Sequence, residues 1–159
     1  MAYSPRLVAN AFLVKAKEAG VPVSHMKLQK LVFFLHAWTL ALREAGSLVD
    51  GKPEAWPYGP VFDGLYHELK SYGASNIGAY LTELNPATGQ MAAMVPSRAD
   101  TEFYQFLDQV WDRYGGFSAL QLSALSHEAG GPWAQARANH AKLIDDEVIR
   151  DYYRGKLAQ

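Results

Sequence analysis

The segment between Ser24 and Gly46 constrains the fold more than any other part of the sequence. Ser24 has the side chain to cap the start of a helix, and Gly46 is suited to end one. Between them, apolar residues recur on one helical stripe at Leu28, Leu31, Val32, Leu35 and Leu42. The pattern predicts one long helix whose apolar stripe faces the core.

Other segments also carry helical start and stop signals. We expect helices over residues 5–19, 59–72, 100–115, 118–128 and 132–139, and a last one from residue 145. The start at Ser118 is the clearest, because Ser118 and Gln121 have the spacing of a capping box. The predicted fold is therefore mainly α, a compact single-domain helical fold of about six to seven helices.

Two segments lack helical periodicity. Residues 48–56 contain Asp50-Gly51 between short apolar runs, which predicts a small β-hairpin around a type I′ turn. Residues 73–99 are rich in Gly, Ser, Asn, Pro and Ala. They predict a long connection with one helical turn near residues 77–81.

The length of 159 residues is typical of one domain, and we expect residues 1–159 to form it. No run of 18 apolar residues could cross a membrane, and the first ten residues lack the pattern of a secretion signal. The chain has no cysteine, which excludes disulfides, thiol catalysis and cysteine zinc sites. These features are compatible with a cytoplasmic location.

Charge is distributed unevenly along the chain. The net charge is −1, yet residues 1–45 hold six Lys and Arg against two acidic residues, a local excess of +4. This excess suggests a nucleic-acid-binding or regulatory protein as the alternative function, although it falls short of the basic balance of a dedicated nucleic-acid binder. Ordinary solvated faces explain it equally simply.

Motifs for catalysis and for cofactor binding are missing from the sequence. His67-Glu68 and His127-Glu128 resemble the opening of a zinc-protease motif, but Ser71 and Gly131 stand where the second histidine belongs. No nucleophile elbow or nucleotide-binding glycine motif occurs. We therefore expect no enzyme, no metal and no cofactor, with a hydrolase assembled by folding around His127 and Glu128 as the remaining catalytic alternative.

The stretch from Trp56 to Pro60 is unusually rigid. Pro57 and Pro60 restrict the residues before them, and Gly59 permits a positive φ or a close approach to another backbone. Trp56 and Tyr58 add large aromatic surfaces that need polar partners if buried. This stiffness suits a core corner and a prebuilt binding edge equally well.

Two lysines on the long predicted helix can be interpreted either as part of a binding patch or as a cover over the edge of the core. Lys27 and Lys30 lie three residues apart beside the apolar stripe, and Phe34 follows one turn after Lys30. They could form a cationic and aromatic patch for an acidic partner or for phosphates. Alternatively, both lysines extend over the edge of the core with their ammonium groups in water.

Three sequence blocks together resemble a known family. They are residues 26–31 (MKLQKL) with Phe33-Phe34, residues 55–66 (AWPYGPVFDGLY) and residues 122–133 (LSALSHEAGGPW). Their order and spacing resemble the Panacea domain of SocA-like antitoxins, and the likeness extends over nearly the whole chain. Members of that family are cytoplasmic, mostly helical proteins that neutralise a toxin by binding it.

The resemblance implies a binding module with no cofactor and no reaction. Its implied partner is a cognate toxin protein, and an adaptor role that delivers the toxin to the ClpXP protease is a further implied function. Tight interfaces concentrate their binding energy in a few aromatic and charged anchors. The expected partner-binding residues are Lys27, Lys30, Phe34, Trp56, Tyr58, Tyr66 and Trp133, each of which could instead serve the core.

Overall fold

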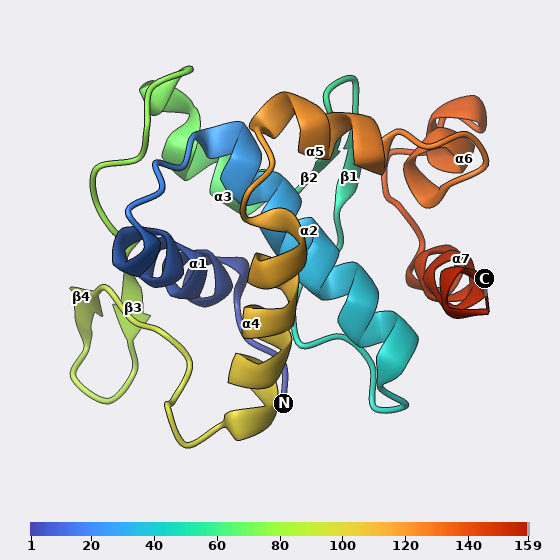
Figure 1. Ribbon diagram of the computed structural model, residues 1–159. Coiled ribbons are helices and arrows are strands. Elements are labelled where there is room, and N and C mark those ends of the chain that lie inside the picture. The colour runs from blue at the N-terminus through green and yellow to red at the C-terminus, as the bar shows by residue number, and fades with distance from the viewer. Residues whose placement is uncertain (159) are drawn as a thin grey trace.

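A long central helix, α2 (His25–Leu42), organises the structure, a computed structural model that describes residues 1–158 (Figure 1). The Ser24 hydroxyl caps it by accepting a hydrogen bond from the Lys27 amide at 3.4 Å. Every residue of α2 except Met26 and Leu42 is buried. The predicted helix is confirmed, but it is covered on all sides because other elements pack around its whole circumference.

Most of the remaining helices pack around α2 (Figure 1). They are α1 (Pro5–Ala19), α3 (Asp63–Leu69), α4 (Thr101–Tyr114), α5 (Ala119–Ser126) and α7 (Asp146–Leu157), while α6 (Pro132–Ala138) packs on α7 and the 3₁₀ turn η1 (Lys70–Tyr72) extends α3. This arrangement confirms the mainly α class. No helix in the described part of the chain is long and apolar enough to cross a bilayer.

The capping box predicted for α5 is present. The Gln121 amide donates to the Ser118 hydroxyl at 3.1 Å, and the Ser118 amide donates to the Gln121 side chain at 2.8 Å. These two bonds satisfy backbone donors that the helix itself cannot pair. The start of α5 is therefore determined locally, and α5 leads directly to Ser126 and His127.

Removing this cap should have a modest and measurable cost. Ser118→Ala deletes the acceptor for the Gln121 amide, so the free energy of unfolding should fall by about 1 kcal/mol in urea denaturation. Ser71→Ala is a matched control, because Ser71 is exposed and its hydroxyl makes no hydrogen bond within residues 1–158. An equal loss in both variants would contradict the assignment of the cap.

The first β-hairpin does not lie where the sequence predicts it. Strands β1 (Glu54–Trp56) and β2 (Gly59–Val61) pair antiparallel, with Trp56 opposite Gly59. The hairpin expected over residues 48–56 is therefore wrong, and the helix expected from residue 59 begins only at Asp63. The reason is long-range: Leu48 and Asp50 bond to the backbone of Tyr3, at 2.9 and 2.7 Å, instead of folding back around Asp50-Gly51.

The connection between η1 and α4 contains a second hairpin and no helical turn. Strands β3 (Glu83–Asn85) and β4 (Gln90–Ala92) pair antiparallel, so the turn expected near residues 77–81 is wrong. The fully buried amide of Asn10 holds this connection to α1. It exchanges two hydrogen bonds of 2.8 Å with the Leu81 backbone and donates to the Met94 carbonyl at 2.9 Å.

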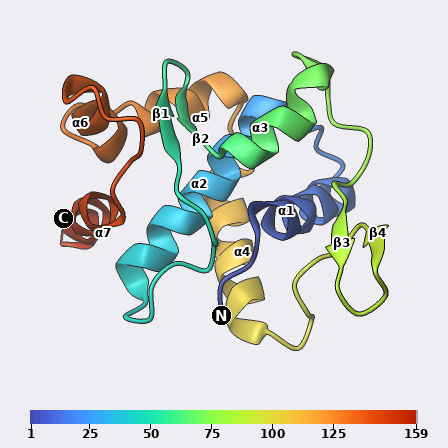
Figure 2. The same cartoon turned by 180° about the vertical axis from the view of Figure 1, so that it is seen from behind.

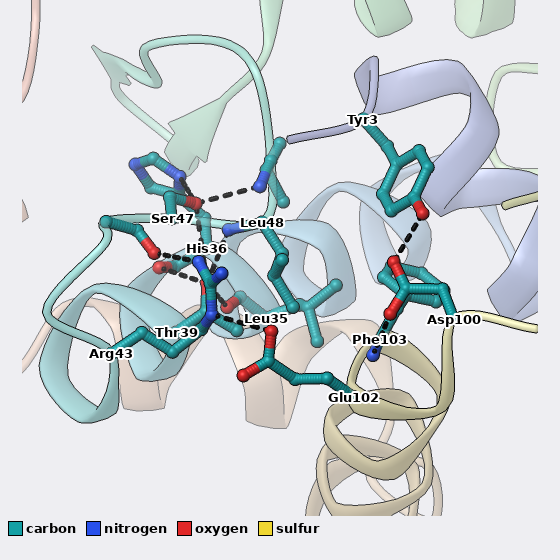
Figure 3. A network of polar contacts seen from close by, with 12 residues as sticks. Tyr3, Leu35, His36, Thr39, Arg43, Ser47, Leu48, Asp100, Glu102 and Phe103 are labelled. Atoms are coloured by element: carbon teal, nitrogen blue, oxygen red, sulfur yellow. Dashed lines mark hydrogen bonds and ion pairs between the residues drawn. The ribbon is translucent and has the colours of Figure 1, made fainter. Parts of the chain in front are cut away.

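Polar contacts also fix the chain near the end of α2 (Figure 3). The Leu48 amide donates to the Thr39 hydroxyl at 3.1 Å, and the Val49 amide donates to the Ser47 hydroxyl at 2.9 Å. The Tyr3 hydroxyl donates to the Asp100 carboxylate, which raises the pKa of Tyr3 to about 12. The bonds at Leu48 and Val49 fix the loop after α2, and the Tyr3 bond attaches the first residues of the chain to the start of α4.

Candidate binding site

Buried polar side chains of α2 hold strand β2 in place. Gln29 donates to the Phe62 carbonyl at 3.1 Å and accepts from the Phe62 amide at 2.9 Å. The fully buried Lys30 extends its ammonium to the Pro60 carbonyl at 3.2 Å. Because unpaired polar groups are costly in the interior, these bonds couple the folding of α2 to the position of β2.

Side chains from α5 and α6 hold the hairpin from another side. The Ser123 hydroxyl donates to the Tyr58 carbonyl at 2.9 Å, and the Trp133 indole donates to the Trp56 carbonyl at 2.7 Å. Arg137 donates to the Ala55 carbonyl at 3.2 Å. The β1–β2 hairpin is therefore attached to three helices through its own backbone.

Gly59 is the point where these supports converge. Its φ of +114° favours glycine, and a Cβ there would lie 2.8 Å from Lys30 Cε, 2.9 Å from the Ser126 hydroxyl and 3.1 Å from His127 Nε2. We call the set of Lys30, Gly59, Ser126 and His127 the hairpin junction. Close contact of this kind requires a residue without a side chain.

Burial controls the charge of the hairpin junction. It lowers the pKa of the Lys30 ammonium to about 7, because no carboxylate within residues 1–158 pairs with Lys30 to offset the loss of water. Burial also lowers the pKa of His127, and the charge of Lys30 acts in the same direction. The nearby Tyr58 backbone opposes this lowering of the His127 pKa. The buried Nε2 of His127 has no hydrogen-bond partner within residues 1–158.

The end of the hairpin carries aromatic side chains outward. Tyr58 lies in the turn and is 65% exposed. Trp56 and Tyr66 are half-buried, with ring centroids 4.5 Å apart, and the Trp56 indole donates to Glu54 at 3.1 Å. We call Trp56, Tyr58 and Tyr66 the hairpin-end aromatics; Figure 2 shows the hairpin and α3 in front.

The structure separates the predicted binding residues into two groups. Trp56, Tyr58, Tyr66 and the half-buried Trp133, whose ring stacks on His127 at 3.8 Å, gather around the hairpin. Lys27, Lys30 and Phe34 are buried instead. They do not form a surface patch, so their expected contact with a partner has no exposed side chain to support it.

Each buried residue of the second group has an internal role. The Lys27 ammonium donates to the Gly115 carbonyl at 2.6 Å, and the Phe34 ring stacks on Tyr114 at 4.1 Å. The lysines therefore do not extend into water either, because backbone carbonyls accept their hydrogen bonds inside the protein. Sequence reasoning missed Gln29 and Ser126 as supports, although Gln29 is a polar residue within an apolar stripe.

The basic excess of residues 1–45 does not form a basic surface. Lys27 and Lys30 are buried, and three of the remaining cations pair with carboxylates of later elements. The pairs are Arg6 with Glu68, Lys15 with Asp108 at 2.9 Å and Arg43 with Glu102 at 3.1 Å. Lys17 is left as the one cation of this segment that is neither buried nor ion-paired within residues 1–158.

His36 is used by the fold. His36 is 1% exposed and lies between the Ser47 hydroxyl at 2.6 Å and the Asp146 carboxylate at 3.0 Å. These are the residue types of a hydrolase triad, but the Ser47 hydroxyl also accepts a bond from the backbone, and the three groups link α2 to α7 and to the loop that follows α2.

His127 and Glu128 do not form a shared site. His127 stacks on Trp133, whereas the Glu128 carboxylate accepts hydrogen bonds from Lys156 at 2.7 Å and from Tyr152. The bond from Lys156 lowers the pKa of Glu128, and the bond from Tyr152 adds to it. Within residues 1–158, no three His, Cys, Asp or Glu side chains are grouped so as to hold a metal ion.

The fold and the hairpin junction define a mainly α-helical protein in which three sequence blocks meet at one rigid hairpin. Comparison with known families matches residues 28–134 to the antitoxin SocA-like family, Panacea domain. The chain belongs to this family, as its sequence blocks suggested, and this membership supports an antitoxin role.

A curated relative extends the likeness to almost the full length. Antitoxin SocA of Caulobacter vibrioides (strain NA1000 / CB15N) is 34% identical over 155 residues, which cover 94% of this chain and 81% of the relative. No solved structure matches the chain. The family resemblance therefore explains why the three blocks occur together, and the structure explains what joins them physically.

Proposed function

We propose that the protein neutralises a cognate toxin by binding it directly, with the hairpin-end aromatics as the anchors of the interface. The observation that carries this proposal is the contrast within one hairpin. Its backbone is attached to α2 by the buried Lys30 and to α5 and α6 by the partly buried Ser123 and Trp133, while Tyr58 in its turn is 65% exposed. Family membership supplies the toxin as the expected class of partner.

Rigidity makes this surface suitable for tight binding. Association loses free energy when flexible loops and side chains become ordered, and a hairpin that is already fixed avoids much of that cost. Tyrosine and tryptophan are enriched among residues whose truncation weakens interfaces most. Hydrogen-bonded supports beneath an exposed aromatic turn therefore favour affinity without requiring a conformational change.

Truncation of the exposed tyrosine is the direct test. Co-expression with the toxin gene next to this one should rescue growth for the native protein and fail for Tyr58→Ala. A lost anchor of about 2 kcal/mol weakens binding roughly 30-fold, which isothermal titration calorimetry would measure. Tyr80→Ala is the matched control, because Tyr80 is also exposed but lies on the connection before β3.

Two outcomes would count against the proposed surface or the proposed function. If Tyr58→Ala and Tyr80→Ala bind the toxin equally well, the hairpin end is not the interface. If no neighbouring gene is toxic and no toxin co-purifies, direct neutralisation itself is rejected. Circular dichroism melts of both variants keep loss of binding separate from loss of folding.

Binding alone and delivery to the ClpXP protease predict different fates for the toxin. An inert complex keeps the toxin at a constant level, whereas an adaptor makes its half-life short only when both this protein and ClpXP are present. Pulse-chase measurement of the toxin in cells with and without ClpXP separates the two. We propose delivery as the finer form of the function, and an unchanged half-life would restrict it to binding.

Nucleic-acid binding remains the alternative function, and the structure favours it less. Its support was the basic excess of residues 1–45, whose cations are now largely buried or paired. A phosphate-binding surface would show affinity that falls steeply as salt rises. Detectable, salt-sensitive binding to duplex DNA at low ionic strength would restore this alternative.

A further inference from the structure

A second surface lies between α4, α5 and α7, where two cavities open on either side of Arg113 and Tyr114. One cavity of about 140 Å³ is lined by Leu42, Phe106 and Leu157, together with residues of α2 and α4. The other, of about 210 Å³, is lined by Phe117 and Leu125 and bordered by Lys156. Arg113 and Tyr114 line both cavities, so the two are adjacent parts of one groove.

Apolar side chains at this groove are unusually exposed. Leu42 is 47% exposed, Leu157 is 54% exposed and Phe117 is 38% exposed. They come from three different parts of the chain: Leu42 and Leu157 line the smaller cavity, and Phe117 lines the larger one. Apolar side chains that gather around a hollow, rather than scatter singly, are typical of a surface that another molecule covers.

Arg113 gives the groove its charge. Its guanidinium lies over the rings of Trp38 and Tyr114, at 5.0 and 5.4 Å from their centroids. It forms no ion pair and no hydrogen bond with another side chain or the backbone within residues 1–158, whereas the neighbouring Lys156 is paired with Glu128. A guanidinium stacked on aromatic rings is held in one orientation, which prepares it to bind a carboxylate through two hydrogen bonds.

We propose that this groove is a docking site for an acidic, amphipathic segment of a partner protein, which places a carboxylate on Arg113 and an apolar side chain in each flanking cavity. Each cavity is smaller than the roughly 300 Å³ at which small-molecule pockets begin, so each suits one side chain of a polypeptide. A nucleic-acid backbone fits poorly, because apolar side chains line both cavities and the larger one also includes the carboxylate of Glu128, which repels phosphate.

The groove is distinct from the hairpin end. Figure 1 has α4 and α5 in front, and Figure 2, seen from behind, has the hairpin and α3 in front. None of the hairpin-end aromatics lines either cavity. The protein can therefore engage two polypeptide surfaces at once, and the docking site stands whether or not the hairpin end binds a toxin.

Paired peptides of opposite charge test the proposal. The probes are a synthetic peptide of leucine and glutamate and the same peptide with lysine in place of glutamate, each titrated into the ¹⁵N-labelled full chain. The glutamate peptide should shift the amide signals of Leu42, Arg113 and Leu157, and the lysine peptide should bind at least tenfold more weakly. A tenfold difference corresponds to about 1.4 kcal/mol, which suits one charge-assisted pair.

Charge reversal on the protein should reverse this preference. Arg113→Glu should weaken the glutamate peptide at least tenfold and strengthen the lysine peptide, while Arg113→Gln weakens the first without strengthening the second. Lys17→Glu, at an exposed position on α1, should leave both affinities unchanged. If Arg113→Glu lowers the melting temperature, the neutral variant Arg113→Gln replaces it as the test of the charge on Arg113.

Several results would overturn the docking site. These are equal affinity for the two peptides, affinity that ignores Arg113, shifts at the hairpin end instead of the groove, or no shifts up to millimolar peptide. Tyr58→Ala should bind the glutamate peptide as the native protein does. A loss in that variant would assign the binding to the hairpin end.

Discussion

Gly59→Ala is expected to lower the free energy of unfolding by about 2–5 kcal/mol, because a positive φ strains any other residue and the added methyl has no space. The methyl would lie 2.8 Å from Lys30 Cε and 2.9 Å from the Ser126 hydroxyl, so the hairpin must move away from α2 and α5. Toxin binding should therefore fail although Tyr58 itself is unchanged. Urea denaturation and the co-expression assay measure the two effects.

Gly64→Ala is the matched control for this change. Gly64 lies on α3, five residues further along, and a Cβ there would meet no atom within 4 Å. Alanine favours helix over glycine by roughly 0.5–1 kcal/mol, so this variant should be equally stable or slightly more stable. If Gly59→Ala also unfolded at the same urea midpoint as the native protein, the close packing at the hairpin junction would be wrong.

The stability of the native protein is expected to rise by about 2–3 kcal/mol between pH 7 and pH 9, since one pKa unit corresponds to about 1.4 kcal/mol. Burial lowers the pKa of Lys30 from 10.5 to about 7 in the folded protein. Between these two values the unfolded chain binds more protons than the folded one, so the free energy of unfolding increases with pH. Below pH 7 both states are protonated and this contribution stays constant.

Other titrating groups act mainly outside this window. The lowered pKa values of His25 and His127 affect stability below pH 6.5, where unfolded histidine begins to bind protons. The raised pKa values of Tyr3 and Tyr153 act in the opposite direction and only near pH 10 and above. Lys27, whose pKa is also lowered by burial, adds to the rise.

Lys30→Met isolates the contribution of Lys30. The variant should lose most of the rise between pH 7 and pH 9, because methionine fills a similar space without a charge. Its absolute stability is a less direct measure, since the Pro60 carbonyl loses its hydrogen bond. Lys17→Met, at an exposed position, should keep the native pH profile. A Lys30→Met profile that is parallel to the native one would show that Lys30 is not buried in its charged form.

Helix positions were predictable because their signals are local. Ser118 accepts the capping hydrogen bond expected of it, Ser4 caps α1 in the same way, and Gly20 adopts the left-handed conformation that ends α1. Each signal depends on atoms within about four residues along the chain. The hairpin at residues 54–61 was misplaced because Asp50-Gly51 is an equally good local turn, and only the bond from Asp50 to Tyr3 excludes it.

The candidate site was predictable in part. The family resemblance brought Trp56, Tyr58, Tyr66 and Trp133 together, and they do gather around one hairpin. The same resemblance could not show that Lys30 points inward, because a lysine beside an apolar stripe has the same spacing whether it reaches water or the core. The acceptor that decides its direction, the Pro60 carbonyl, lies thirty residues away in sequence.

The sequence by itself determined the helical class, the ends of most helices and the family, because periodicity, caps and ordered motifs are properties of neighbouring residues. Tertiary structure alone decided which residues of the three blocks are supports and which are surface. That choice depends on burial and on hydrogen bonds between α2, the hairpin, α5 and α6, which form only when the chain is folded. Gly59 illustrates the difference, since its conformational freedom is readable in the sequence but the three side chains that require it are not.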